Sequence, residues 1–152
     1  MHMELILWRH AEAEDGFPDL ARELTGKGRK QARQMADWLI DRLPQDTRIL
    51  VSPAARTRQT AEFLGLDFSI LEELAPGAPA GQLLAVAGWP AGPHNVLIVG
   101  HQPTLGEAAA LAMTGNTAGW GVKKGGLWWL SSRSRLSPNE CVLRAVIAPD
   151  LL

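Results

Sequence analysis

The stretch Leu5–His10, which reads LILWRH, decides the fold of this chain. Four consecutive apolar residues are typical of a short strand that is buried on both faces, as in a parallel sheet. Arg9 and His10 follow at the carboxyl end of that strand, where open α/β sheets bind their ligands. The stretch therefore predicts an α/β domain with a cationic site at the end of its first strand.

Two later segments repeat this arrangement. Residues 49–56 read ILVSPAAR and residues 96–101 read VLIVGH, so each apolar run is followed by a basic or imidazole side chain. The carboxyl ends of parallel strands share one edge of a sheet, and we therefore expect these side chains to meet there. The converging residues are Arg9, His10, Ser52, Arg56 and His101. Together they predict one anion site built from distant parts of the chain.

The rest of the chain alternates strand and helix patterns. Strands are expected at residues 4–8, 48–51, 68–71, 95–99, 125–130 and 141–147. Helices are expected after Thr25, from Ser52 to about Leu64, over residues 80–88 and after Pro103. This alternation indicates a largely parallel sheet with helices on both faces. The last two strands have no helix between them, which favours an antiparallel edge.

Three local signals sharpen these expectations. Thr25 is a preferred helix cap, and the helix after it should bury one stripe of apolar side chains. The expected stripe is Ala32, Met35, Ala36, Leu39, Ile40 and Leu43. Ser52 and Pro53 are typical of a helix start, with the serine as cap and the proline as first residue. A polar loop is expected at Ser137–Asn139, between the last two strands.

Composition restricts the classes of protein that fit. The chain has 152 residues and a formal net charge of −1, which suits one domain over residues 1–152 and argues against nucleic-acid binding. No apolar run is long enough to span a membrane, and the amino terminus lacks the apolar region of a signal peptide. Cys141 is the only cysteine, so an internal disulfide is impossible. We expect a cytoplasmic monomer without membrane partners.

The residue types at the expected site suit phosphoryl transfer. A histidine can act as a covalent nucleophile and split one difficult displacement into two easier ones. Arginine binds phosphate oxygens in a bidentate manner, so Arg9 and Arg56 can hold the group that His10 attacks. A protonated His101 would add positive charge. With this much cationic charge we expect no metal and no cofactor.

Three motifs resemble those of the histidine phosphatase superfamily, also called phosphoglycerate mutase-like. They are residues 7–13 (LWRHAEA), 51–61 (VSPAARTRQTA) and 99–103 (VGHQP). The short chain, the Arg-His-Ala sequence and RELTxxG at residues 22–28 look most like the SixA-type phosphohistidine phosphatase branch. This resemblance implies a three-layer α/β sandwich. It also implies that His10 is the phosphorylated nucleophile and that Arg9, Arg56 and His101 form the phosphate pocket.

The resemblance also suggests two further site residues. Larger members of the family carry a general acid in an L-x-E segment after the second helix, and Leu71–Glu73 matches it, so Glu73 is the candidate acid. Arg22 either reaches the phosphate or only fixes the loop before the helix that follows Thr25. A pocket without a placed acid suits an N–P bond better than a phosphate ester. Short connections over residues 74–94 would leave the site open to a protein surface.

These points favour hydrolysis of phosphohistidine in a signalling or phosphotransfer protein. Three alternatives remain. The first is a phosphatase acting on a small phosphorylated metabolite, and the second is a phosphate-binding module without turnover. The third is a metal hydrolase using the acidic residues Glu12, Glu14 and Asp15, whose spacing matches no compact metal motif.

Overall fold

A computed structural model describes residues 2–133 and 140–152, so the loop expected at Ser137–Asn139 lies outside the described residues. The strands are β1 (Glu4–Arg9), β2 (Thr47–Val51), β3 (Ser69–Ile70), β4 (Asn95–Gly100), β5 (Leu127–Ser132) and β6 (Cys141–Ile147). The α-helices are α1 (Gly26–Ile40), α2 (Ala55–Glu62), α3 (Ala80–Ala87) and α4 (Thr104–Thr114). Short 3-10 turns are η1 (Asp19–Ala21), η2 (Glu72–Leu74) and η3 (Pro149–Leu151). No helix in the described part of the chain is long and apolar enough to cross a membrane.

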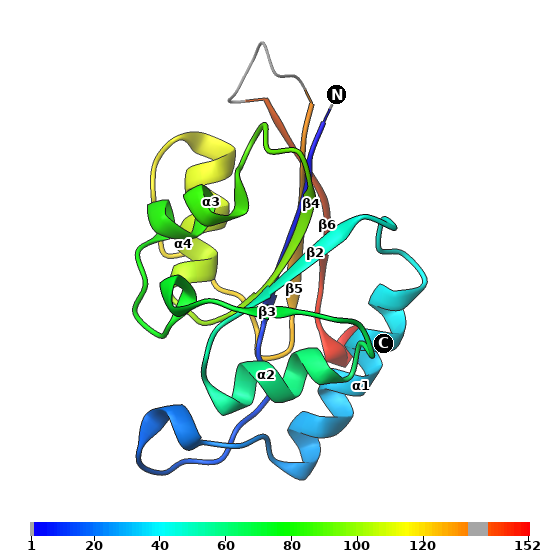
Figure 1. Cartoon of the computed structure of the whole chain (residues 1–152), viewed down its shortest axis with the longest axis vertical. Helices are drawn as coiled ribbons and strands as arrows, with labels where there is room; N and C mark the ends of the chain where they lie inside the picture. Colours follow the sequence, from blue (N-terminus) through cyan, green and yellow to red (C-terminus); the bar gives the residue numbers. More distant parts are fainter. Residues whose placement is uncertain (1, 134–139) are drawn as a thin grey trace.

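The strands form one sheet in the order β3-β2-β4-β1-β5-β6 (Figure 1). The strands β1, β2, β3 and β4 pair in parallel, and Arg9 lies opposite Gly100 in the β1–β4 register. The strand β5 runs antiparallel to both of its neighbours, β1 and β6. The mostly parallel sheet with an antiparallel strand is therefore confirmed, and that strand lies inside the sheet next to the edge.

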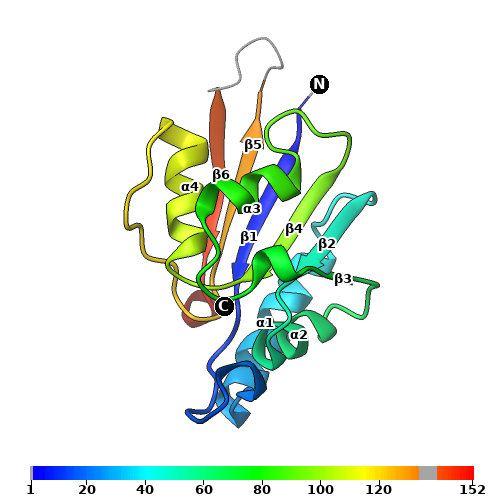
Figure 2. The same ribbon diagram turned by 60° about the vertical axis from the view of Figure 1, so that its left-hand side comes forward.

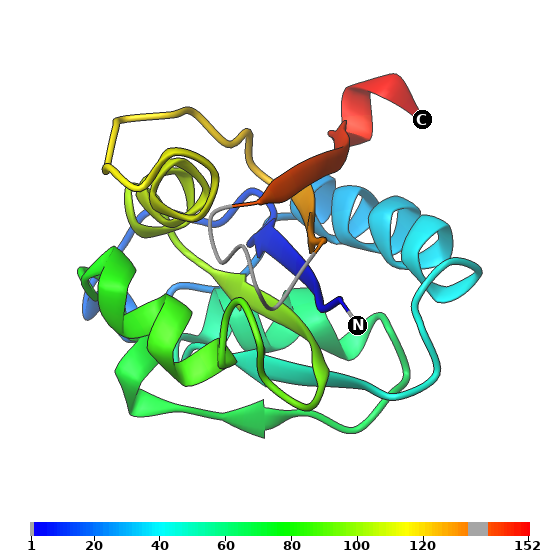
Figure 3. The ribbon, with the colours of Figure 1, turned by 90° about the horizontal axis from the view of Figure 1, so that it is seen from above.

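Helices cover both faces of the sheet, which makes three layers (Figure 2). Alternate residues of β1 supply the two cores, because successive side chains of a strand point to opposite faces. Ile6 and Trp8 pack with α1 and α2, whereas Leu5 and Leu7 pack with α3 and α4. The view from above shows α1, in blue, on one side of the sheet, and α3, in green, and α4, in yellow-green, on the other (Figure 3).

The helix α1 begins as the sequence predicts, but one residue of its expected apolar stripe is exposed. The hydroxyl oxygen of Thr25 accepts a hydrogen bond from the backbone N–H of Gly28 at 2.9 Å, so Thr25 is the cap. Leu39 is fully buried, whereas Ile40 is 45% exposed. The placement of Ile40 on the buried stripe was therefore wrong. Ile40 lies about 100° around the helix from Leu39, on the side that faces solvent.

The start of α2 also differs from the prediction. The helix begins at Ala55 after an extended Ala54, so Ser52 and Pro53 lie before it. Ser52 is not its cap, because Ala54 holds that position. The Ser52 hydroxyl oxygen accepts from the backbone N–H of Ala54 at 3.4 Å, before the helix, and lies 2.7 Å from Nε2 of His101. The hydroxyl of Thr57 instead donates to the backbone carbonyls of Ser52 and Ala54, each at 2.9 Å. The serine that the sequence assigned to helix capping therefore belongs to the site.

Candidate active site

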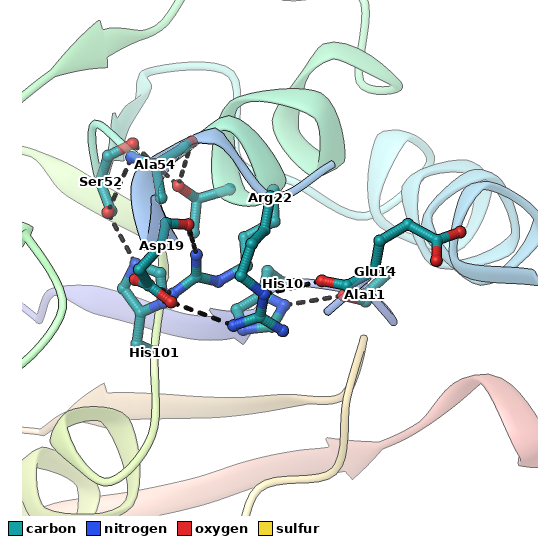
Figure 4. Close-up of polar contacts among 10 residues, drawn as sticks. His10, Ala11, Glu14, Asp19, Arg22, Ser52, Ala54 and His101 are labelled. Atoms are coloured by element: carbon teal, nitrogen blue, oxygen red, sulfur yellow. Dashed lines mark hydrogen bonds and ion pairs between the residues drawn. The ribbon is translucent and has the colours of Figure 1, made fainter. Parts of the chain in front are cut away.

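His10 lies directly after β1, at the edge where the parallel strands end, and is 8% exposed. Its backbone N–H donates to the carbonyl of Gly100 at 3.2 Å, and its carbonyl accepts from the N–H of Gly125 at 2.9 Å. These two bonds hold the residue from the end of β4 and from the segment just before β5. The ring nitrogen Nδ1 is 2.7 Å from the carbonyl oxygen of Ala11 (Figure 4). A carbonyl only accepts hydrogen bonds, so Nδ1 carries the proton and Nε2 keeps its lone pair.

Burial lowers the pKa of His10 to about 4, and the charges of Arg56 and Arg9 act in the same direction. The bond to Ala11 opposes this shift but does not overcome it. At neutral pH the ring is therefore uncharged. A buried, neutral imidazole with a free Nε2 lone pair is chemically suited to nucleophilic attack.

His101 lies beside His10, with the two ring centroids 5.3 Å apart. Its Nδ1 faces the Nη2 of Arg56 at 3.4 Å, and a guanidinium can only donate. The proton of His101 therefore sits on Nε2 and is donated to the hydroxyl oxygen of Ser52 (Figure 4). Burial, followed by His10 and Arg56, lowers the pKa of His101 to about 3. His101 is thus neutral at neutral pH, and the arginines carry the positive charge beside it.

Two arginines bring buried positive charge to the histidines. Arg56 lies in the first turn of α2 and is 4% exposed. Arg9 is half-buried and donates from Nη1 to the carbonyl of Val122 at 2.8 Å. The Nε atoms of both arginines are buried and have no hydrogen-bond partner among the described residues. Buried donors without a partner are rare in proteins, and an anion is the kind of group that would satisfy them.

The structure adds Asp19, which the sequence did not single out. Its carboxylate Oδ2 lies 3.1 Å from Nη2 of Arg56, and its backbone carbonyl accepts from Nη1 at 2.8 Å. The other oxygen, Oδ1, accepts from Nη1 of Arg22 at 3.1 Å. Hydrogen bonds from Arg22 and Arg56 hold the pKa of Asp19 below its usual range. One Asp in an acidic loop forms no motif, so no sequence signal marks it.

These side chains surround a cavity of about 240 Å³. Its lining residues are Arg9, His10, Ala13, Asp15, Arg22, Arg56, Pro76, His101, Gln102 and Lys124. Arg22 reaches the wall and also fixes the loop, because its Nε donates to the carbonyl of Glu14 at 2.7 Å. Lys124 adds a cation that sequence reasoning missed; the only available signal was a Lys pair followed by a Gly pair before β5.

Glu73, the candidate acid, is not brought to this cavity. It is exposed in η2, and its backbone carbonyl accepts from the side chain of Gln82 at 2.7 Å. Pro76, three residues further on, is the nearest part of that segment to line the cavity. Asp15 is the one carboxylate among the lining residues.

The acidic loop before α1 shows no metal-binding arrangement. The Oε2 atom of Glu12 accepts from the hydroxyl of Thr25 at 2.8 Å, so this carboxylate supports the start of α1. Across residues 2–133 and 140–152, no three His, Cys, Asp or Glu side chains are grouped as metal ligands.

The segment before β5 is hydrogen-bonded to the end of β1 and brings Lys124 to the cavity. The indole N–H of Trp8 donates to the carbonyl of Gly125 at 2.8 Å, and the backbone N–H of Arg9 donates to Gly126 at 2.9 Å. Lys124 directly precedes these two glycines. These two hydrogen bonds therefore connect the end of β1 to the segment that carries Lys124.

Comparison with known proteins agrees with this geometry. The sequence model of the histidine phosphatase superfamily (branch 1) matches residues 5–75. The phosphohistidine phosphatase SixA of Escherichia coli is 33% identical over 124 residues, which cover 76% of this chain and 77% of that protein. The chain belongs to the histidine phosphatase superfamily. Within that superfamily it is a SixA-type phosphatase, and the predicted three-layer α/β fold is confirmed.

Other relatives of this SixA-type phosphatase extend the likeness to the full length of the chain. An uncharacterized protein of Picosynechococcus is 37% identical over 143 residues, which cover 86% of each chain. The structure of a SixA complexed with tungstate superposes with a TM-score of 0.81 at 25% identity, covering 98% of this chain and 99% of that one. A putative SixA from Nakamurella multipartitia gives a TM-score of 0.79 at 29% identity, covering 98% and 97%.

Proposed function

We propose that this phosphatase removes phosphate from phosphohistidine in a signalling or phosphotransfer protein, through a covalent phosphohistidine formed on His10 and without a metal. One observation carries the proposal. The Nε2 atom of His10 is unprotonated and belongs to a cavity whose wall holds Arg9, Arg22 and Arg56. A nucleophile with a free lone pair is thus surrounded by groups that bind phosphate oxygens.

The proposed chemistry has two steps. In the first, the Nε2 lone pair of His10 attacks phosphorus, and the bond between phosphorus and the leaving atom breaks. In the second, water attacks the phosphorus on His10, which releases inorganic phosphate and restores the neutral ring. The guanidiniums of Arg9 and Arg56 stabilise the charge on the transferring group in both steps. Their positive charge supplies what a metal ion supplies in other phosphatases.

The leaving group favours an N–P bond. A phosphohistidine that is protonated on its other ring nitrogen leaves as neutral imidazole, so it needs no proton donor in the pocket. A phosphate ester leaves as an alkoxide and requires an acid. Glu73 is exposed and does not line the cavity, and Asp15, the only lining carboxylate, is itself exposed to solvent and not enclosed with the histidines. The residues around the pocket therefore suit phosphohistidine better than a sugar phosphate.

The route into the site is consistent with a protein substrate. From the connection over residues 74–94, only Pro76 lines the cavity. No long segment from that side contributes a wall, which leaves room for a phosphorylated side chain presented by another protein.

A trapping experiment tests the mechanism. The phosphatase is mixed with a phosphohistidine protein, quenched in base after milliseconds and analysed for acid-labile, base-stable phosphate on His10. The His10→Ala variant should give neither label nor turnover. Hydrolysis by the unaltered protein without a labelled intermediate would exclude the covalent route.

A substrate panel with and without a chelator tests specificity. We expect a higher kcat/KM for phosphohistidine than for sugar phosphates, with no change when EDTA is added. Preference for sugar phosphates would support the small-molecule alternative. Loss of activity in EDTA, restored by a divalent cation, would contradict the metal-independent mechanism.

A further inference from the structure

The chain between β1 and α1 presents two apolar side chains to solvent next to the cavity. Phe17 is 97% exposed and Leu20 is 49% exposed. Figure 1 shows this segment, in blue, projecting beyond the end of the sheet. Of the exposed large apolar residues in the described chain, Phe17 is the most exposed, and it lies two residues from both Asp15 and Asp19.

The exposure of Phe17 is imposed by bonds that hold its loop against the site. Asp19, between Phe17 and Leu20, is bound by Arg56 and Arg22. The backbone N–H of Glu14 donates to the carbonyl of Glu23 at 2.8 Å, which closes the base of the loop. The middle of the loop is therefore fixed to Arg56 and Arg22, and its two ends are fixed to each other. Phe17 is therefore held in solvent, two residues along the chain from Asp15, which lines the cavity.

Phe17 and Leu20 lie outside the cavity, so only a ligand that extends beyond the cavity can contact them. Neither Phe17 nor Leu20 lines the cavity, whereas their neighbours Asp15 and Arg22 do. A ligand small enough to lie within the cavity does not need to extend to either residue. A ligand that fills the cavity and continues past its mouth on this side meets an exposed aromatic ring. Aromatic residues are enriched in the cores of protein interfaces, where their burial contributes much of the binding energy.

We propose that Phe17 and Leu20 form a docking contact for the protein that carries the phosphohistidine, and that they bind an apolar surface next to the phosphorylated residue. This inference rests on the proposed function and names the part of the chain that distinguishes a phosphoprotein from a free phosphorylated compound. Arg56 and Arg22 then have two roles, because they bind phosphate and also hold the docking loop in place through Asp19.

Two substrates with the same scissile bond isolate the docking contact. One is a phosphotransfer protein phosphorylated chemically on histidine with phosphoramidate, and the other is free phosphohistidine. Release of inorganic phosphate is measured for Phe17→Ser and Leu20→Ser. The matched control is Leu66→Ser, because Leu66 is 47% exposed and lies past the far end of α2 from Arg56.

We expect Phe17→Ser to lower kcat/KM for the phosphoprotein at least tenfold, mainly through KM, and Leu20→Ser to lower it less. Turnover of free phosphohistidine should stay unchanged in both variants, and Leu66→Ser should change neither substrate. Equal loss on both substrates, or no loss on the phosphoprotein, would overturn the docking contact while leaving the proposed function intact. Failure of the unaltered protein to hydrolyse either N–P substrate would instead overturn the proposed function, and the docking contact with it.

Discussion

The carboxylate of Asp19 lies 3.1 Å from Nη2 of Arg56, and the backbone carbonyl of the same residue accepts from Nη1 at 2.8 Å. The protein thus places an anion of its own on a guanidinium that the proposed mechanism uses for phosphate. Arg22 binds the second carboxylate oxygen, so the contact spans two of the cations in the wall. A bound phosphate must share these donors with Asp19 or displace it. This relationship leads to the first prediction.

Replacement of Asp19 by Asn should strengthen the binding of oxyanions. The amide removes the negative charge at Arg56 and Arg22 but leaves the backbone carbonyl bond in place. We expect the inhibition constant of inorganic phosphate to fall several-fold. The matched control is Asp150→Asn, because Asp150 also pairs with a cation, Lys123 at 3.0 Å, but neither residue lines the cavity. An inhibition constant that is unchanged or higher in Asp19→Asn would show that Asp19 does not compete with phosphate.

Ser52→Ala should reduce activity more than its effect on stability explains. The Ser52 hydroxyl is the partner of Nε2 of His101, and its loss leaves a buried N–H without an acceptor. Such a loss costs about 1–3 kcal/mol of unfolding free energy. The freed His101 ring should lower kcat at least tenfold with little change in KM.

Ser132→Ala provides the comparison for Ser52→Ala. Ser132 is also buried and bonded, accepting from the N–H of Met3 at 2.8 Å, but it lies at the opposite end of the sheet. The Ser132→Ala variant should lose as much unfolding free energy as Ser52→Ala and keep the kcat of the unaltered protein. An equal fall of kcat in both variants would indicate a structural role for Ser52 and no special role in the site.

The two buried histidines predict how stability changes with pH. Burial lowers the pKa of His10 to about 4, whereas an unfolded histidine titrates near 6.5. Between these values the unfolded chain binds the extra proton, so stability falls as pH falls. From pH 7.5 to 4.5 this accounts for roughly 2 kcal/mol from His10. His101, with a pKa of about 3, should act in the same direction.

Urea denaturation of the unaltered protein and of His10→Ala at both pH values measures this contribution. The carboxylates that titrate in the same range are common to both proteins and cancel in the difference. We expect a smaller loss of stability in His10→Ala. Parallel losses in the two proteins would mean that His10 titrates normally in the folded state.

Gly28→Ala should damage both the fold and the site. A Cβ atom at Gly28 would lie 1.9 Å from the backbone carbonyl oxygen of Glu12, two residues after His10. Neither atom belongs to a flexible side chain, so the backbone must shift. We expect a loss of about 2 kcal/mol of unfolding free energy, with reduced kcat.

Gly26→Ala is the matched variant for Gly28→Ala in the same helix. A Cβ atom at Gly26 meets nothing within 4 Å, so its stability should change by less than about 1 kcal/mol. Alanine has a higher helix propensity than glycine, so propensity cannot cause a loss in either variant. Similar losses in the two variants would exclude the contact with Glu12 as the cause.

Strands with strong apolar runs could be predicted closely from the sequence. The run before His101 was expected at residues 95–99 and forms β4, and the last strand has the expected bounds, Cys141–Ile147. Four consecutive aliphatic residues have few alternatives to a buried strand. The convergence of His10, Arg56 and His101 followed from parallel pairing alone, because parallel strands bring their carboxyl ends together.

The rest of the site depends on tertiary contacts that local patterns do not encode. Ser52 has the sequence of a helix cap, and only the tertiary structure places its hydroxyl beside His101. Asp19 and Lys124 come from loops without periodicity, so their approach to Arg56 and to the cavity has no signature in the chain. Glu73 was chosen by motif spacing, and its exposure reflects the path of η2 rather than its place in the sequence.

Arg9 and Gly100 face each other in the β1–β4 register, so His10 and His101 each lie one residue beyond the same pair of facing residues. The geometry of the pair is therefore tied to strand length. Insertion of one residue into either strand would turn one imidazole toward the opposite layer, away from its counterpart. Insertions and deletions in this protein are therefore expected in the connections and not in β1 or β4. A design that transfers the two histidines to another sheet must keep each of them one residue beyond the same pair of facing residues.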